Sequence, residues 1–423
     1  MYEGFVPRSC FPMSIFSNKI LDRINGEEIA KLTLDLVNIH SVTGTEQVIQ
    51  EFYAAYLKKA GLEVKMQQVD ETGRSNVIGK ISGRGDGKNL MIHSHLDTIG
   101  WADCVQPYYN KDENRVYGRG AADMKGQCAL QAVAGKAIID SGIKLNGDLY
   151  IIGSVGEELT LKPDGSYWKI GAQASVEQSF PVPDAAVVLE CHPPLGLALA
   201  NKGAMGFEFT VYGADRLLHE SAVPFFNNPT YWQAEVIVAL EKLNQELSKR
   251  KHPHAGPPYI NVMSSTHPVF SNTVPTSIKI RGTRRINPGE TREGVLAEFD
   301  ALVNELRRRS PLRIEMSLAG SGEPLAWEVS PDEPIVKSFQ KAFKEVVGKD
   351  VLLGGHAAAS DARWFNKGVS EWHKKYNPKG ITTIAFGPNH DSLHSNLEHI
   401  DVGQAVTAAK VITLATLDFC GTV

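Results

Sequence analysis

Cysteine is scarce in this chain, and the few cysteines are scattered. Five occur among 423 residues, and no two of them form a CxxC pair. They are Cys10, Cys104, Cys128, Cys191 and Cys420. An odd number of widely spaced cysteines is not the framework of a disulfide-stabilised secreted domain, so a reducing compartment is expected. We therefore predict a cytoplasmic protein.

Long apolar runs and an excess of positive charge are also lacking. No stretch approaches the roughly 18 consecutive apolar residues of a membrane span. The N-terminus lacks the basic start and unbroken apolar run of a signal peptide. Lys and Arg number 44 against 48 Asp and Glu, which gives a net charge of -4. Since no basic excess can neutralise a phosphate backbone, we predict neither a membrane nor a nucleic acid as partner.

The sequence does contain an alternation of strand and helix patterns, which is interrupted once. Apolar strand-like segments alternate with helical patterns on both sides of the interruption, and this order predicts a mixed, largely parallel sheet with helices on both faces. Within the interruption, the predicted strands and helices follow the β-α-β-β-α-β order of the ferredoxin-like split motif. We predict an α/β catalytic domain, residues 1–198 and 319–423, and an inserted α+β domain, residues 199–318.

Polar residues gather where the predicted strands end. Ligands of open α/β sheets bind outside the carboxyl ends of the strands. The segments at these positions are HSHLDT (93–98), GEE (156–158) and LEC (189–191), joined by YGRGAADMKG (117–126) and LHSNLEH (393–399). The GRGAAD run lacks the third glycine of a dinucleotide fingerprint. The sequence therefore predicts a polar site at this edge of the sheet.

The first of these segments places two histidines and a carboxylate on one side of a strand. Residues i and i+2 of a strand face the same way, so Asp97 can accept the free N–H of His95 and fix its tautomer. His93 is also in phase, and the spacing alone leaves both histidines as candidates. A buried histidine with a merely structural role is the alternative for either one.

The other segments supply carboxylates and a second imidazole. Adjacent acids such as Glu157 and Glu158 repel each other unless a cation lies between them, and one can bind a metal while the other takes a proton from water. Alone, this pair can be a solvated acidic turn and Asp123 a helix N-cap. Together the candidates suit a two-metal site of Zn, Co or Mn. The candidate ligands are His95, Asp123, Glu158, Glu190 and His394.

In this order and spacing the motifs resemble a known family over residues 28–415, nearly the whole chain. It is the family of co-catalytic zinc deacylases and peptidases that includes acetylornithine deacetylase, succinyl-diaminopimelate desuccinylase, aminoacylase and carboxypeptidase G. The further matching motifs are SVTGTE (41–46), NTVP (272–275), NPGET (287–291), SDAR (360–363) and LHSNLE (393–398). The sequence departs from the family at Gly156, where an acid usually precedes the glutamate pair.

The resemblance implies a role for each candidate and settles His95 over His93. His95 and Glu190 would bind one metal ion, Glu158 and His394 the other, and Asp123 would bridge them. Glu157 would be the general base, and Asp97 would orient His95. The inserted domain would be a lid and dimerisation domain. In it His219 would stabilise the oxyanion, while Asn272 and Arg285 would contact the carboxylate end of the substrate.

The predicted function is hydrolysis of a C–N bond, most simply an amide, in a small carboxylate-bearing substrate such as an N-acyl amino acid. The predicted cofactor is one or two divalent ions of Zn, Co or Mn, and the predicted assembly is a homodimer or a higher homo-oligomer. Two alternatives remain at this point. One is an aminohydrolase that deaminates an aromatic amine such as an aminobenzoate, and the other is a catalytically silent binding protein on the same fold.

Overall fold

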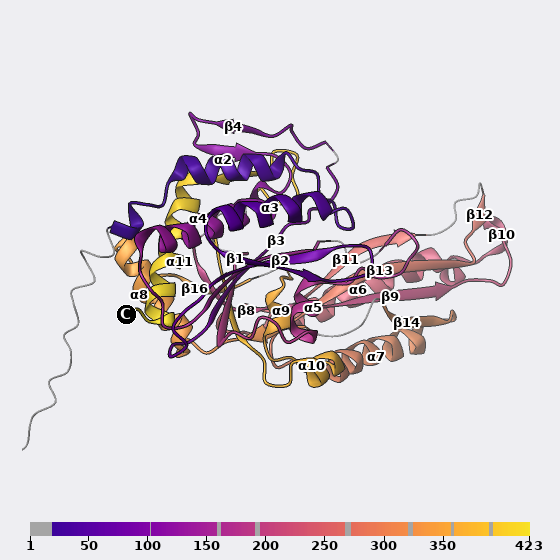
Figure 1. Cartoon of the computed structure of the whole chain (residues 1–423). Helices are drawn as coiled ribbons and strands as arrows, with labels where there is room; N and C mark the ends of the chain where they lie inside the picture. Colours follow the sequence, from indigo (N-terminus) through magenta and orange to yellow (C-terminus); the bar gives the residue numbers. More distant parts are fainter. Residues whose placement is uncertain are drawn as a thin grey trace, which may run out of the picture. The chain divides into compact units, whose positions relative to one another are not determined.

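The structure is a computed structural model, and it divides the chain into two compact units (Figure 1). It describes residues 19–101, 103–158, 162–190, 195–266, 272–319, 325–356, 359–388 and 392–423. Unit 1 comprises Met1–Leu197, Ser330–Leu352 and Ile381–Val423, and unit 2 comprises Ala198–Val329 and Leu353–Gly380. Among the described helices, none is long and apolar enough to cross a membrane.

Unit 1 is built on a mixed sheet whose central strands are parallel. Its strands follow the order β1-β2-β6-β3-β7-β17. Their bounds are β1 Glu63–Gln68, β2 Ser75–Ile81, β3 Leu90–His95, β6 Leu149–Ser154, β7 Ala185–Val188 and β17 Thr382–Phe386. β6, β3, β7 and β17 pair in parallel, whereas β1 and β2 are antiparallel to their neighbours. The predicted α/β class with a largely parallel sheet is therefore confirmed.

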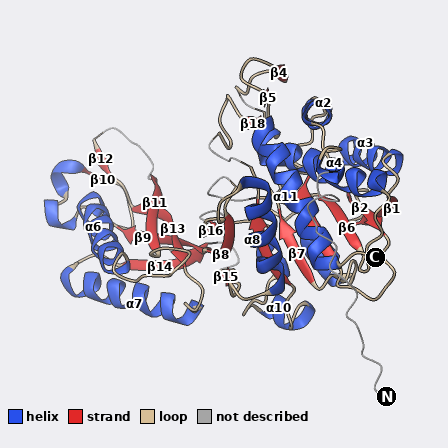
Figure 2. Cartoon of the chain, turned by 90° about the vertical axis from the view of Figure 1, so that its left-hand side faces the viewer, coloured by secondary structure: helices blue, strands red, loops and turns tan. Residues whose placement is uncertain are grey.

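Helices cover this sheet because its central strands are apolar on both sides. Every residue of β3 and β6 is buried. The helices of this unit are α2 Gly26–Val37, α3 Gln47–Lys59, α4 Gly126–Ser141, α5 Gly171–Glu177, α8 Pro334–Val347 and α11 Val402–Cys420. α3 packs on β2, and α4 packs on β3 and β6, with α2 and α11 against α4 (Figures 1 and 2).

A small three-stranded sheet in unit 1 brings two distant parts of the chain together. Its strands are β4 Tyr108–Asn110, β5 Arg115–Tyr117 and β18 His399–Asp401, in the order β18-β5-β4. His399 lies opposite Tyr117 in the antiparallel pair of β18 and β5. The segment that precedes β18 therefore lies beside the turn that follows β5, and each of these segments carries one of the predicted metal ligands.

Unit 2 contains a four-stranded antiparallel sheet with two long helices. The sheet has the order β11-β13-β9-β14, and the chain follows a β-α-β-β-α-β path through it. The elements are β9 Gly203–Tyr212, α6 Pro229–Leu247, β11 Tyr259–Thr266, β13 Ser277–Ile286, α7 Arg292–Arg309 and β14 Ile314–Ala319. Figure 2 shows α6 and α7 against this sheet, and apolar side chains such as Phe207, Phe209 and Phe299 form the core between them.

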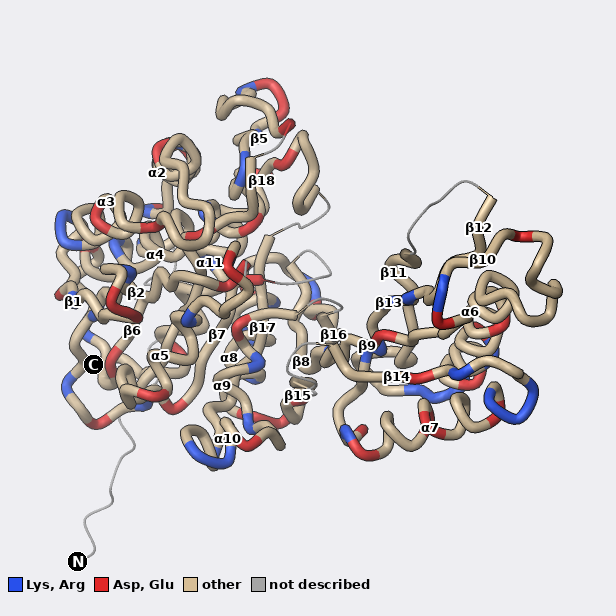
Figure 3. Tube along the Cα trace, turned by 90° about the vertical axis from the view of Figure 1, so that its right-hand side faces the viewer, with Lys and Arg blue, Asp and Glu red and all other residues tan. Residues whose placement is uncertain are grey.

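The remaining elements of unit 2 are short. They are β8 Leu197–Asn201, β10 Leu218–His219, β12 Thr273–Val274, β15 Trp327–Glu328, β16 Leu353–His356, α9 Ala362–Phe365 and α10 Glu371–Tyr376. β15 and β16 pair with β8, and β10 pairs with β12. Relative to the domain predicted from the sequence, unit 2 also includes residue 198 and residues 319–329 and 353–380. Figure 3 shows basic and acidic residues interspersed along α6 and α7, as the near-balanced composition implies.

Candidate metal centre

Three neighbouring parallel strands deliver polar residues to one edge of the sheet of unit 1. β3 ends at His95, β6 leads into Glu157 and Glu158, and β7 leads into Glu190. The register pairs His95 with Ser154 and His93 with Val188, so continuing it puts Glu190 level with His95. The carboxyl ends of parallel strands meet at the same edge, which is why residues far apart in the sequence converge here.

His95, Asp123 and Glu158 form a compact cluster, and each offers one ligand atom within 4.8 Å of the others. His95 Nε2 lies 3.1 Å from Asp123 Oδ1. His394 Nε2 lies 3.3 Å from Asp123 Oδ2 and 3.2 Å from Glu158 Oε2. Each imidazole thus faces a different oxygen of one carboxylate, which is the arrangement a bridging ligand requires.

Burial, hydrogen bonds and neighbouring charges set the protonation of this cluster. Burial and the nearby charge of Asp123 raise the pKa of Glu158 to about 8. Hydrogen bonds to Asp123 and Glu158 raise the pKa of His394 to about 10. Burial opposes the charged form of His95, but Asp123, Asp97 and Glu158 outweigh it and hold its pKa well above the usual range. Protons therefore occupy the positions that a more highly charged ion would compete for.

The residues of the cluster fit divalent metal ions. Glu158 Oε1 is buried and has no hydrogen-bond partner among the described residues. Buried carboxylates are stable only when they are paired, protonated or bound to a metal. Two imidazoles with several carboxylates form the mixed N/O ligand set of Zn, Co or Mn sites. His93 is not part of the cluster: burial and His95 lower its pKa to about 3, so it stays neutral.

Asp97 contacts both His95 and the glutamate turn. Its backbone carbonyl, and not the predicted carboxylate, is the nearer partner of His95. The nearest acceptor of His95 Nδ1 is the carbonyl oxygen of Asp97, at 3.0 Å, while the carboxylate Oδ1 lies at 3.5 Å. Because a carbonyl only accepts, Nδ1 carries the proton and Nε2 is the atom left to bind a metal. The Asp97 carboxylate accepts the peptide N–H groups of Glu157 and Glu158, each at 3.1 Å, and the Thr43 hydroxyl at 2.6 Å.

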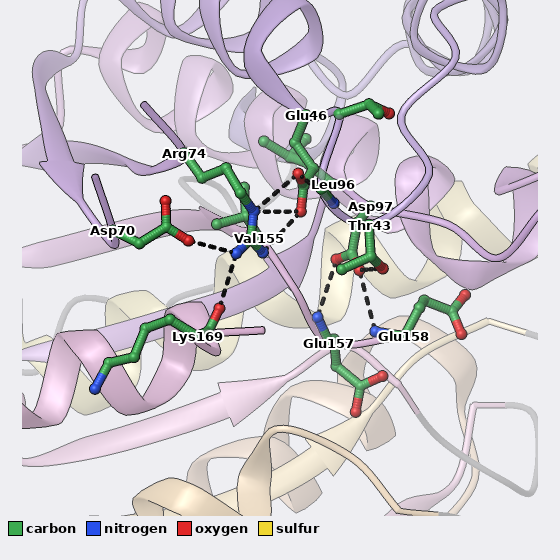
Figure 4. A network of polar contacts seen from close by, with 12 residues as sticks. Thr43, Glu46, Asp70, Arg74, Leu96, Asp97, Val155, Glu157, Glu158 and Lys169 are labelled. Atoms are coloured by element: carbon green, nitrogen blue, oxygen red, sulfur yellow. Dashed lines mark hydrogen bonds and ion pairs between the residues drawn. The ribbon is translucent and has the colours of Figure 1, made fainter. Parts of the chain in front are cut away.

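The carboxylate of Asp97 therefore holds the turn formed by Glu157 and Glu158 through both of its peptide N–H groups. Figure 4 shows the side chains of Glu157 and Glu158 leaving this turn in different directions, with Asp97 behind it. Glu158 joins the metal-ligand cluster, whereas the carboxylate of Glu157 is not among the clustered ligand atoms. One turn can thus supply a ligand and a separate base.

A residue without a predicted role holds the turn that carries Asp123. The Glu398 carboxylate accepts the peptide N–H groups of Gly120, Ala122 and Asp123 at 2.9–3.1 Å and pairs with Arg119 at 2.5 Å. Glu398 is fully buried. The only signal in the sequence was its place in the LHSNLE motif, four residues after His394. The contact spans 275 residues, so no local pattern predicts it.

The other three predicted site residues lie in unit 2. His219 in β10 pairs with Thr273 in β12, and the Glu220 N–H donates to the Asn272 carbonyl at 3.0 Å. His219 and Asn272 are therefore neighbours. His219 Nδ1 lies 2.8 Å from the Ser221 hydroxyl oxygen and 3.3 Å from the Ser221 peptide nitrogen, so this nitrogen is engaged by Ser221. Arg285 lies on β13 opposite Ala204.

Comparison with known proteins agrees with the resemblance inferred from the motifs. The succinyl-diaminopimelate desuccinylase of Pseudoalteromonas atlantica is 22% identical, over 91% of this chain and 96% of its own length. The N-formyl-4-amino-5-aminomethyl-2-methylpyrimidine deformylase of Bacillus subtilis is 24% identical, over 93% of this chain and 95% of its own length. Both are similar along nearly their whole length.

Solved structures share the fold. YxeP of Bacillus subtilis, described as a dinuclear metal binding peptidase, superposes with a TM-score of 0.67 at 15% identity, over 94% of this chain and 99% of that one. The sequence profile described as peptidase family M20/M25/M40 matches residues 91–418, which is most of the chain. This match confirms the predicted family and the predicted class of enzyme, a hydrolase. The chain belongs to peptidase family M20/M25/M40.

Proposed function

We propose that this protein is a metal-dependent hydrolase that cleaves the C–N bond of an amide in a small, carboxylate-bearing substrate such as an N-acyl amino acid. One observation carries the proposal: His95 and His394 face the two oxygens of one buried carboxylate, Asp123, with Glu158 beside them. The relatives named desuccinylase and deformylase support an acyl group as the part removed.

The same cluster supports a two-ion centre. We assign His95 and Glu190 to one ion, Glu158 and His394 to the other, and Asp123 to both. The YxeP structure, described as a dinuclear metal binding peptidase, supports two ions. When bound, divalent ions such as Zn, Co or Mn supply a Lewis acid and a water of lowered pKa.

Glu157 is the proposed general base. Its backbone is fixed through the Asp97 carboxylate, and its side chain leaves the turn on a different path from Glu158 (Figure 4). It accepts a proton from the attacking water and returns the proton to the leaving nitrogen. His219 is the proposed donor to the developing oxyanion, because its ring is exposed and Ser221 engages Nδ1, which leaves Nε2 as the nitrogen that would donate.

Arg285 is the proposed anchor for the substrate carboxylate, with Asn272 as a second contact. On β13 the other basic side chains are ion-paired: Lys279 and Arg281 with Glu208, and Arg284 with two glutamates. Arg285 has no such partner among the described residues. The buried ammonium of Lys202 lies near it and donates to the Ala255 carbonyl. An anion would relieve the repulsion between these two cations.

Unit 2 is also the proposed lid and dimerisation domain, within residues 199–318. β11 and β14 are the edge strands of its four-stranded sheet, and the outer residues of β11 include the exposed side chain of Met263. Bare strand edges with exposed apolar side chains are usually covered in solution.

We assign the protein to the cytoplasm, where the buried free thiols of Cys104, Cys128 and Cys420 would persist.

The test is hydrolysis by chelated and reloaded protein. Protein stripped of metal and then reloaded with Zn, Co or Mn is assayed on N-acyl amino acids and dipeptides, with separate measurement of the released acid, amine and ammonia. The proposal expects activity only after reloading, with acid and amine as products. Full activity in stripped protein, or ammonia release from an aromatic amine in place of amide cleavage, would refute it.

A further inference from the structure

A buried arginine lies behind the glutamate turn and has so far no role in the site. The side chain of Arg74, just before β2, has no exposed surface. Its Nε and Nη2 donate to the Glu46 carboxylate at 2.9–3.1 Å, and its Nη1 donates to Asp70 Oδ2 at 2.8 Å and to the Lys169 carbonyl at 3.1 Å. Glu46 is also fully buried, whereas Asp70 keeps some exposed surface.

One route from this guanidinium to the turn runs through the loop before α3. The Glu46 carboxylate also accepts the peptide N–H of Gly44, at 2.8 Å, which fixes the loop that carries Thr43. The Thr43 hydroxyl donates to Asp97, and Asp97 accepts both N–H groups of residues 157–158. Figure 4 shows both ends of this series, the ion pair of Arg74 with Glu46 and the contacts of Asp97 with the two glutamates.

A second route is direct contact with the turn. Gly156 has a φ of +79°, and a Cβ built on it would lie 2.3 Å from Arg74 Nη2 and 2.9 Å from the Lys169 carbonyl oxygen. The guanidinium thus fills the space into which a side chain at position 156 would point. The guanidinium carbon of Arg74 also lies 4.8 Å from the centroid of the Trp168 ring, over its face. The positive φ and this packing together favour glycine at position 156.

We propose that Arg74 is a positioning residue for the Glu157–Glu158 turn, and that it acts through Glu46 and Asp97 and through its packing against Gly156. The inference rests on the proposed function, because it assigns Glu157 as base and Glu158 as ligand. Arg74 itself touches neither substrate nor metal. Partners that orient ligands in this way typically change metal affinity or activity about 10- to 100-fold when they are altered.

The chain offers a matched control on the same guanidinium. Asp70 and Glu46 both bind Arg74, but only Glu46 continues toward Asp97 and the turn. R74K keeps the positive charge but loses the planar guanidinium, which donates from two nitrogens to the Glu46 carboxylate at once. E46Q removes the inner carboxylate, and D70N removes the outer one. R74K and E46Q are expected to act on the site, whereas D70N is expected to lower only thermal stability.

The readouts are Co²⁺ binding, followed by the visible absorption of the bound ion, and kcat and KM on the best N-acyl amino acid of the panel. We expect R74K to weaken the affinity for one Co²⁺ ion or to lower kcat about 10- to 100-fold, with KM changed less than about threefold. D70N should match the wild type in both. If R74K and D70N lower the melting temperature alike and leave Co²⁺ spectra and kcat unchanged, Arg74 has a structural role only.

Gly156→Ala tests the direct contact without removing an ion pair. We expect G156A to lower kcat or Co²⁺ affinity at least about tenfold in the wild-type background, and clearly less in the R74K background, where the shorter cation leaves space for the methyl group. Independent, multiplicative effects would overturn this part of the inference. Failure of the proposed function is distinguishable, because the wild type would then bind no Co²⁺ or cleave no amide in the panel.

Discussion

Two clusters of charge, one in each unit, shift the pKa of a glutamate in opposite directions. In unit 1, burial and Asp123 raise the pKa of Glu158 to about 8. In unit 2, burial also disfavours the charged form of Glu290, but hydrogen bonds from Arg284 and Arg250 outweigh it and hold its pKa below the usual value. Desolvation acts on both carboxylates, so the difference lies in the neighbouring side chains.

The comparison shows which of the two clusters contains permanent positive charge. Arg284 and Arg250 bind Glu290 and Glu298, so both of these carboxylates meet permanent positive charge. The cluster of unit 1 offers its carboxylates only imidazoles, whose charge depends on pH. This difference in neighbouring charge supports the proposed metal centre in unit 1 and a stabilising role for the arginine–glutamate cluster in unit 2.

The largest expected effect follows from removing the proposed general base, Glu157. E157Q should lower kcat by about 100- to 10,000-fold, because an amide cannot accept the proton of the attacking water. Metal content, measured by elemental analysis of the purified protein, should stay at the wild-type level. E158Q is the matched variant on the same turn, and it should lose metal. Exchange of these two outcomes would mean that base and ligand are assigned in the wrong order.

The corresponding change in unit 2 should affect stability and not catalysis. R284M leaves Glu290 and Glu298 with the partly exposed Arg250 alone, and loss of the buried charged hydrogen bonds should cost about 1.5–3 kcal/mol of unfolding free energy. Denaturant unfolding measures this loss, while kcat of the folded enzyme should remain unchanged. The exposed pair of Arg309 with Glu235 is the control, since R309M should cost less than about 1 kcal/mol. A large fall in kcat for R284M would contradict the comparison.

The two clusters should also respond differently to pH. In metal-free protein the pKa of His394 is raised from 6.5 to about 10. A raised pKa in the folded state gives stability that is fully present below the unfolded pKa and is lost as pH rises through the folded one. Metal-free protein should therefore lose stability between about pH 6.5 and 10. The lowered pKa of Glu290 acts only in acid, so its cluster with Arg284 and Arg250 adds no slope there.

Thermal unfolding of stripped and Co²⁺-loaded protein at several pH values measures this difference. Bound metal replaces the protons of the cluster, so the stabilisation by metal should grow between about pH 6.5 and 9.5, by an amount on the order of a few °C. H394N, which removes one of the titrating groups, should weaken the dependence above about pH 8, where Glu158 no longer titrates. A metal-induced stabilisation that is constant over this range would show that the protons and the metal do not compete.

The sequence could predict those parts of the site that local patterns encode. His95, the Glu157–Glu158 pair and Glu190 follow buried strands, and the ends of parallel strands meet. The α/β class and the family followed from the same patterns and motifs. Spacing could not separate His95 from His93, because both face the same side of β3 and both are buried. Only the resemblance to the family made that choice.

The contacts that hold the site in place could not be predicted from local patterns. Arg74 and Glu46 are 28 residues apart, and Glu398 and Asp123 are 275 apart. Each pair forms only because the tertiary fold brings two loops together. The spacing of His95 and Asp97 predicted a contact between the two residues. It could not tell whether the carbonyl oxygen or the carboxylate of Asp97 would be the partner of the His95 ring. Only the structure shows that the carbonyl is the nearer acceptor.

The smallest expected effect concerns the basic side chain of β13 that has no carboxylate partner among the described residues. R285K keeps the charge but loses the bidentate geometry that an arginine offers to a carboxylate. KM for substrates with a free carboxylate should rise roughly 3- to 10-fold, with unchanged metal content and a smaller change in kcat. R281K on the same strand is the control, because Arg281 is already paired with Glu208 and its loss should leave KM unchanged. Steady-state kinetics on matched free acids and their amides measures both effects. If the amides are cleaved as well as the acids, or if R281K raises KM as much as R285K, Arg285 is not the carboxylate anchor.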